Sequence, residues 1–208
     1  MNKLLLHRTS KPLLFACLLL PIAYLLRGAL AHTLGANPAE ALIRGTGDWT
    51  LRLLCLTLAV TPLRQALGWT ALARFRRMLG LYVFVYACIH FMCYAWLDME
   101  MNWADILKDI SKRPFILVGT GCLVLLLPLA ATSSNRAVRA LGAARWRALH
   151  RLVYGIALLA LLHFFWMRAG KNDFGEWSLY AAALALLLGW RVWRHLRSAP
   201  MTLPRATS

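Results

Sequence analysis

Three histidines within or beside apolar stretches of this sequence, His90, His150 and His163, are the residues best suited to chemistry. Histidine at bilayer depth is rare and usually functional. A neutral imidazole binds a metal or a haem iron through one ring nitrogen. His150 and His163 are thirteen positions apart, which corresponds to about 20 Å of rise on an α-helix. These side chains predict metal or haem ligands at two depths of the membrane.

His90 and His163 form the more natural pair, because both are expected a little past the middle of helices that run in the same direction. Two neutral imidazoles that clamp a planar macrocycle from opposite sides make a low-spin b-type haem site in a helical bundle. The alternative is two unrelated histidines that hydrogen-bond to neighbouring helices. The matched depth of the two side chains favours the ligand pair.

Two arginines inside apolar segments, Arg27 and Arg52, are the predicted partners of haem propionates. A buried arginine is costly unless it is paired, and the acidic residues lie mostly further toward the ends of the segments. The competing interpretation is that the two side chains extend to the membrane interface, which Arg52 could do more easily than Arg27.

His150 has no equivalent partner. An ideal helix turns about 100° per residue, so a separation of thirteen leaves His150 and His163 about 140° apart around the axis. The position fourteen residues before His90 holds Arg76 rather than histidine. A histidine at the membrane interface is the other interpretation, so a second haem stays open. Two further histidines on the same side are candidate partners, His7 and His195.

Composition places the chain in a membrane. Of its 208 residues, 60% are hydrophobic and 15% charged, whereas a soluble domain carries about 25% charged residues. The formal net charge of +16 falls mostly in short loops between apolar segments, so nucleic-acid binding is not expected. The five cysteines lie in apolar segments without a CxxC spacing, which indicates free thiols rather than disulfides or a zinc site.

The apolar pattern predicts an all-α integral membrane protein with six transmembrane helices. Each segment is near the twenty or so residues that a spanning helix needs, and the strand alternation of a membrane barrel is missing. The first segment is expected to be a retained helix rather than a signal peptide. One domain over 1–199 and a C-terminal tail over 200–208 are expected. The segments are 12–33, 47–67, 79–97, 115–132, 149–167 and 177–194.

The loop charges predict that both termini are cytoplasmic. Sixteen basic and no acidic residues fall on one side, against six basic and all eight acidic residues on the other, and excess Lys and Arg marks the cytoplasmic side. The acidic outer loop 98–109 is then a candidate docking edge for a soluble partner, with ordinary solvation as the alternative. The six basic residues of the outer side are Arg44, Lys108, Lys112, Arg113, Arg168 and Lys171.

Several motifs, taken in order along the chain, resemble the MsrQ family, once called YedZ. The expected third helix carries the run 76–81 (RRMLGL), followed by His90 and Tyr94. The family belongs to the ferric-reductase-like transmembrane superfamily, which implies a six-helix haem bundle with ligands on helices three and five. The other matching positions are Thr61-Pro62, Arg113-Pro114-Phe115, Thr132-Ser133, Arg139, Leu141-Gly142, Trp146, Leu149-His150, Tyr154 and His163.

This resemblance implies an electron carrier of the bacterial inner (cytoplasmic) membrane. Family members pass electrons from the quinone pool, or from a cytosolic flavin reductase, to MsrP, a periplasmic molybdopterin subunit that reduces methionine sulfoxide in oxidised proteins. The implied cofactors are b-type haem and FMN, and the implied haem ligands are His90, His150 and His163. The fourth histidine of the two-haem pattern is absent, so one haem is expected, and no motif locates FMN.

Two other functions remain as alternatives. A stand-alone transmembrane haem ferric reductase or quinol oxidase would act without a partner. A cofactorless transporter or assembly factor would predict discontinuous helices with paired intramembrane acids, and the nearest acid to such a position, Asp48, stands at the end of a segment. The chain has no glycine-rich dinucleotide fingerprint, so it is not expected to take hydride from NADPH itself.

Overall fold

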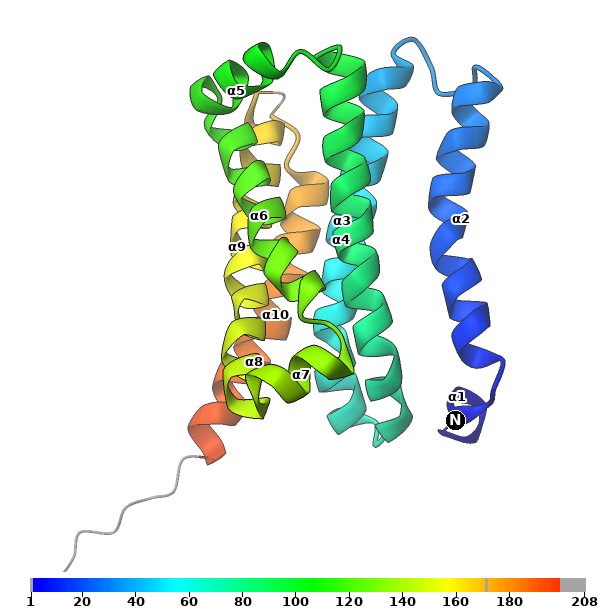
Figure 1. Cartoon of the computed structure of the whole chain (residues 1–208), viewed down its shortest axis with the longest axis vertical. Coiled ribbons are helices and arrows are strands. Elements are labelled where there is room, and N and C mark those ends of the chain that lie inside the picture. The colour runs from blue at the N-terminus through cyan, green and yellow to red at the C-terminus, as the bar shows by residue number, and fades with distance from the viewer. Residues whose placement is uncertain (1, 171, 199–208) are drawn as a thin grey trace, which may run out of the picture.

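A computed structural model of the chain describes residues 2–170 and 172–198, and every regular element within that part is helical (Figure 1). The predicted domain end at 199 and tail at 200–208 lie outside the described residues, as does Lys171. The elements are α1 (Asn2–Leu6), α2 (Ser10–Leu30), α3 (Pro38–Ala66), η1 (Thr70–Phe75), α4 (Arg76–Cys93), η2 (Tyr94–Asp98), α5 (Trp103–Lys112), α6 (Pro114–Ala131), α7 (Asn135–Leu141), α8 (Ala143–His150), α9 (Leu152–Ala169) and α10 (Gly175–Ser198).

Helices occupy all six predicted segments, and four stretches are long and apolar enough to cross a membrane. These four are Ser10–Leu30, Thr70–Asp98, Pro114–Ala131 and Ala143–Ala169. The helices α3 and α10 stand where the second and sixth spans are predicted, but neither belongs to this set of four. The membrane-protein class is therefore supported, while the count of six spans stays a prediction.

Side-chain caps explain where two helices begin. The helix α3 starts well before residue 47, because the Asn37 side chain accepts a hydrogen bond from the Glu40 N–H at 3.1 Å and Pro38 occupies the first turn. The unpredicted helix α5 has Asn102 at its start, whose side chain accepts from the backbone N–H of Ala104 at 3.1 Å. The outer loop of the sequence analysis is thus largely a surface helix.

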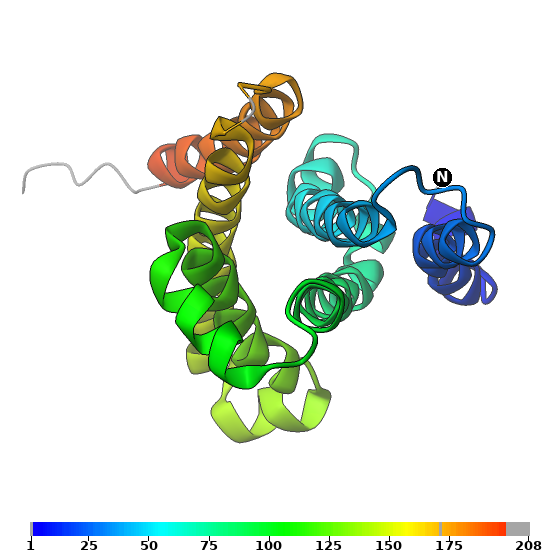
Figure 2. The same cartoon turned by 90° about the horizontal axis from the view of Figure 1, so that it is seen from above.

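The helices form two groups around the centre of the bundle, with α2 at the edge (Figure 2). The helix α3 packs along α4, α6 packs along α9, and α10 contacts both α3 and α9. Two tyrosines of α4 hold α2 in place: the Tyr82 hydroxyl donates to the Phe15 carbonyl at 3.0 Å, and the Tyr86 hydroxyl donates to the Leu18 carbonyl at 2.7 Å. The central helices, rather than α2, therefore surround the middle of the molecule.

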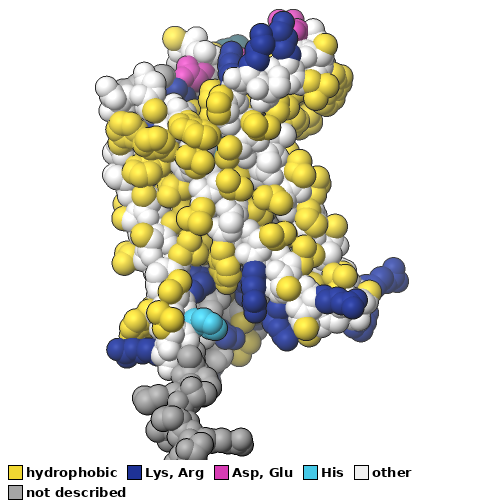
Figure 3. All heavy atoms as spheres, turned by 90° about the vertical axis from the view of Figure 1, so that its left-hand side faces the viewer, with side chains coloured by type: hydrophobic (Ala, Val, Ile, Leu, Met, Phe, Trp, Pro, Cys, Tyr) yellow, Lys and Arg dark blue, Asp and Glu magenta, His cyan; other side chains and the backbone are white. Residues whose placement is uncertain are grey.

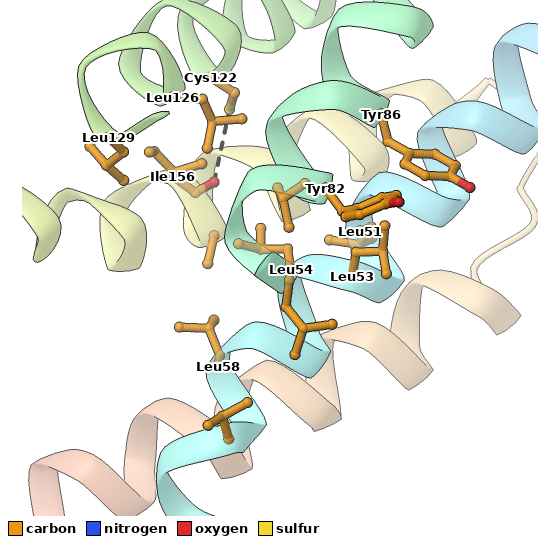
Figure 4. Packing of buried hydrophobic residues seen from close by; sticks show 14 of the residues in the cluster. Leu51, Leu53, Leu54, Leu58, Tyr82, Tyr86, Cys122, Leu126, Leu129 and Ile156 are labelled. Carbon is orange, nitrogen blue, oxygen red and sulfur yellow. Dashed lines mark hydrogen bonds between the residues drawn. The ribbon is translucent and has the colours of Figure 1, made fainter. Parts of the chain in front are cut away.

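Buried leucines of α3 fill the core between α4, α6 and α9 (Figure 4). Leu53, Leu54 and Leu58 are almost fully buried. Ile156 of α9 is also buried, and its carbonyl accepts a weak hydrogen bond from the Cys122 thiol of α6 at 3.8 Å. This contact fits the prediction of free thiols that behave as small apolar groups.

Apolar side chains cover the flank of the molecule between two charged ends (Figure 3). On the face shown, acidic side chains gather only at the end that carries α5, and Lys or Arg occurs at both ends. We call these ends the α5 end and the α8 end. An apolar belt between polar ends is the surface that a lipid bilayer requires. The orientation, with the α5 end outside, stays a prediction.

Candidate functional site

A cavity of about 590 Å³ opens between α3, α4, α6 and α9. This volume lies in the range of about 300–1,000 Å³ typical of ligand sites. Most of its wall is apolar, and its polar and charged side chains include His90 of α4 and His163 of α9. The structure therefore brings together the two histidines that the sequence analysis paired.

The two imidazoles are neighbours with defined hydrogen bonds. Their ring centroids lie 6.2 Å apart, and the ring planes are inclined at 79°. The Nδ1 atom of His90 is 2.8 Å from the Ile43 carbonyl, and that of His163 is 2.6 Å from the Phe115 carbonyl. A carbonyl oxygen only accepts, so each Nδ1 carries the proton. Each neutral ring then keeps a lone pair on Nε2, which is the atom that binds a metal.

A glycine lies beneath each imidazole. A Cβ atom at Gly47 would lie 3.0 Å from Cε1 of His90, and one at Gly119 would lie 2.8 Å from Cε1 of His163. Each glycine follows the accepting carbonyl by four residues, Ile43 in α3 and Phe115 in α6. Residues four apart share a helix face, so a missing side chain at the second position lets the imidazole reach the carbonyl at the first.

This geometry suits a metal that takes its other ligands from a bound group. With metal–nitrogen distances of about 2 Å, two imidazoles on one metal have ring centroids about 6 Å apart, close to the observed separation. Within the described residues, no group of three or more His, Cys, Asp or Glu side chains is placed to hold a metal ion. The pair offers two nitrogen ligands, which is what haem iron takes from a protein in a bis-histidine site.

His150 lies apart from this cavity, at the α8 end. Its Nε2 is 3.1 Å from the Thr132 hydroxyl, and its ring stacks on that of Trp146 with centroids 4.0 Å apart. The helix α8 ends at His150 and α9 begins at Leu152, so the predicted continuous helix 149–167 is divided at Arg151. The candidate partners, His7 and His195, are exposed. A haem-ligand role for His150 stays a prediction of the family resemblance.

Neither predicted propionate partner lines the cavity. Arg27 is exposed on α2, the helix at the edge of the bundle. Arg52 lies five positions beyond Gly47, about 140° around the axis of α3, and faces α10. Its Nε donates to the Tyr180 hydroxyl at 3.0 Å, and its Cζ lies 4.9 Å from the centre of the Trp49 ring.

Two arginines that the sequence analysis assigned to outer loops do line the cavity, Arg44 and Arg113. Nη2 of Arg44 lies 2.6 Å from Oε1 of Glu40, and Nε of Arg113 lies 2.9 Å from Oδ1 of Asp109. The loop assignment missed Arg44 because α3 begins at residue 38. Arg113 stands in the matched Arg113-Pro114-Phe115 motif, which was the available signal for it.

Comparison with known proteins gives one consistent family. Residues 46–162 match the family of ferric reductase like transmembrane components. The chain is 61% identical, over 95% of its length and 90% of the relative, to the protein-methionine-sulfoxide reductase heme-binding subunit MsrQ of Polaromonas naphthalenivorans. It is 52% identical to the MsrQ of Herminiimonas arsenicoxydans, over 88% of the chain and 84% of the relative. It is 50% identical to the MsrQ of Bordetella pertussis, over 91% of the chain and 93% of the relative.

No solved structure matches the chain. The matched span 46–162 begins in α3, runs through α4 and α6, and ends in α9 one residue before His163. These are the four helices that enclose the cavity. Identity of 50–61% over nearly the whole chain decides the family. The chain belongs to the MsrQ family, within the ferric-reductase-like transmembrane group.

Proposed function

We propose that the chain is the haem-carrying membrane subunit of a protein-methionine-sulfoxide reductase system. The observation that supports this most is the His90–His163 pair, with Nδ1 of each ring held by a backbone carbonyl and the rings beside one cavity. The names of the relatives, which call them heme-binding subunits of that reductase, point the same way. The chain itself is not expected to act on methionine sulfoxide.

In this proposal His90 and His163 hold one b-type haem through Nε2. The haem supplies one-electron redox chemistry when it is bound. The chain's own residues fix the ligands: the Ile43 and Phe115 carbonyls set the protonation of the rings, and the largely apolar cavity wall surrounds them. A hydrogen bond donated by the non-ligating nitrogen of a metal-bound histidine orients the ring and raises its basicity.

The proposed route of electrons crosses the bacterial inner membrane. The chain takes electrons from quinol of the quinone pool, or from a cytosolic flavin reductase, and gives them to a periplasmic molybdopterin subunit, MsrP. That subunit reduces methionine sulfoxide, so the system repairs oxidised periplasmic proteins. FMN and a second haem near His150 are further expectations of the family resemblance, not of the geometry.

Reoxidation kinetics test the carrier function against its alternative. The full chain in detergent is reduced with dithionite, the excess is removed, and the reduced haem spectrum is followed after mixing. The proposal expects rapid reoxidation by the molybdopterin subunit with methionine sulfoxide, and no comparable rate with methionine sulfoxide alone. A stand-alone ferric reductase would instead be reoxidised by ferric chelates and not by that subunit. A stand-alone quinol oxidase would turn over quinol without it.

A further inference from the structure

Each anchored histidine has an arginine beside its accepting carbonyl. Arg44 follows Ile43, whose carbonyl accepts from His90. Arg113 precedes by two residues Phe115, whose carbonyl accepts from His163. Both arginines line the cavity that the two imidazoles share. Residues 43–44 and 113–115 therefore each provide two things: the carbonyl that accepts from a histidine ring, and an arginine that lines the cavity.

Arg113 is held by one edge of its guanidinium. Its Nε bonds Oδ1 of Asp109 at 2.9 Å, and the other oxygen of that carboxylate, Oδ2, accepts from the Tyr94 hydroxyl at 2.8 Å. Among the described residues, no hydrogen bond joins Nη1 or Nη2 of Arg113 to the protein. The side chain is 52% exposed, so its two terminal nitrogens are available to a bound anion.

Arg44 of α3 is held through a terminal nitrogen instead of Nε. Its Nη2 pairs with Glu40 one turn earlier at 2.6 Å, and its side chain is 30% exposed. Three acids also line the cavity, Glu40, Asp48 and Asp98. The cavity lining as a whole is therefore not positively charged enough to attract any anion. Direct contact with a guanidinium is what would select a carboxylate there, because a planar guanidinium binds a carboxylate through paired hydrogen bonds.

We propose that Arg44 and Arg113 bind the two carboxylates of the macrocycle that His90 and His163 hold. This inference rests on the proposed haem function and adds the residues that recognise the cofactor's acidic edge. Asp109 and Tyr94 act as positioning residues for Arg113. The arginines first predicted for this role, Arg27 and Arg52, serve as the matched controls, since neither lines the cavity.

The test compares haem b with its dimethyl ester, in which both carboxylates are blocked. Full-length chain, purified after expression under haem limitation, is titrated with each porphyrin in detergent. The variants are Arg44→Gln, Arg113→Gln and the double variant, with Arg27→Gln and Arg52→Gln as controls. The readouts are the dissociation constant and the low-spin bis-histidine spectrum, which also reports that each variant is folded.

We expect the unaltered chain to bind haem about tenfold or more tightly than the ester, as lost charged hydrogen bonds predict. Each single variant should lower this preference severalfold, the double variant should abolish it, and affinity for the ester should stay unchanged. The controls should keep the full preference. Equal binding of both porphyrins by the unaltered chain, or a full preference in the double variant, would overturn the inference alone. No low-spin spectrum with either porphyrin would overturn the proposed function as well.

Discussion

Gly47 and Gly119 matter because of what lies directly above them. At Gly119, a Cβ would come within 2.8 Å of Cε1 and 2.9 Å of Nδ1 of His163. The ring cannot keep both its place and its bond to the Phe115 carbonyl once that atom is present. At Gly47 beneath His90 the corresponding approaches are 3.0 and 3.1 Å, so a Cβ there would require the ring to move by only a few tenths of an ångström. Close approach, rather than backbone freedom, is the reason for glycine at both positions.

We therefore predict that Gly119→Ala lowers haem occupancy and alters the spectrum of the bound fraction. Overpacking of this kind costs about 1–3 kcal/mol, enough to reduce occupancy at limiting haem. Gly121→Ala is the matched control on the same helix, because nothing lies within 4 Å of a Cβ there. Haem per chain, measured after purification at limiting haem, checks this. Full occupancy and an unchanged spectrum in Gly119→Ala would show that the ring does not depend on the glycine.

The pairing of His90 with His163 could be predicted from the sequence, but the groups that surround the two rings could not. His90 and His163 are rare polar side chains at matched depth, and that pattern is visible without coordinates. The carbonyls that accept their hydrogen bonds belong to apolar residues, Ile43 and Phe115. Every residue has a backbone carbonyl, so the sequence does not show which one acts as an acceptor. The position of Arg52 outside the cavity lining could not be read from the sequence for a related reason: its depth is visible there, but the face of α3 on which it lies depends on packing against α10.

At the scale of elements, the surface helix α5 contacts two residues that line the cavity. It carries Asp109, which bonds both Arg113 at the start of α6 and Tyr94 at the end of the α4 region. Its buried Ile106 packs with Tyr94 and Ile116 in a small second core. The helix is held by its cap and by this cluster rather than by the main core.

Removal of the α5 cap should loosen this helix without unfolding the bundle. In Asn102→Ala, the side chain that accepts from the Ala104 and Asp105 N–H groups is lost, which costs about 1 kcal/mol of helix stability. We expect faster amide hydrogen exchange over 103–112 and no change in α3 or α9. Ser111→Ala, an exposed change in the same helix, is the control. Equal exchange in both variants would rule out a role for the cap.

The tyrosine bonds that hold α2 can be weakened singly. Tyr86 is 1% exposed and donates to the Leu18 carbonyl at 2.7 Å, so Tyr86→Phe removes one buried hydrogen bond at a cost of about 0.5–1.5 kcal/mol. We predict a lower Tm of the detergent-solubilised chain and an unchanged haem spectrum. Tyr24→Phe, at a 72% exposed position of α2, should leave Tm unaltered. Loss of haem in Tyr86→Phe would mean that α2 supports the site after all.

Helix positions were predictable from apolar runs, and helix starts were not. The runs marked α6 and α9 closely, because a membrane span is long and its composition is distinctive. Single capping residues, Asn37 and Asn102, mark the earlier start of α3 and the start of α5, and their side chains act only in the folded geometry. Neither helix start changes the hydrophobic pattern, so a count of apolar residues does not detect the start of α3 or of α5.

At the scale of the whole molecule, the charge distribution predicts the orientation in the membrane. All eight acidic residues are predicted for one side of the membrane, and sixteen basic residues for the other. Excess Lys and Arg favours the cytoplasmic side. In the predicted orientation the paired histidines would lie nearer the outer face, where the proposed periplasmic partner would approach. The docking role of the 98–109 region stays a prediction of this arrangement.

Reporter fusions test this orientation. A fluorescent protein fused at either terminus should be fluorescent in cells, because both ends are predicted to be cytoplasmic, and alkaline phosphatase at the same positions should be inactive. Phosphatase inserted after Met101, between η2 and α5, should be active. The opposite pattern at the termini would reverse the sidedness of the haem site, and a mixed pattern at the two termini would contradict an even number of spans.

The most direct test of the central claim is the optical spectrum of the detergent-purified chain, oxidised and dithionite-reduced, with haem per chain quantified. The account predicts a low-spin b-type spectrum that is lost in His90→Ala and in His163→Ala, the two rings that share the cavity. His150→Ala is the matched histidine control and should keep that spectrum; a fall to about half the haem would place a second site there. A chain that binds no haem when haem is supplied in excess, or one whose spectrum survives both substitutions, would contradict the account.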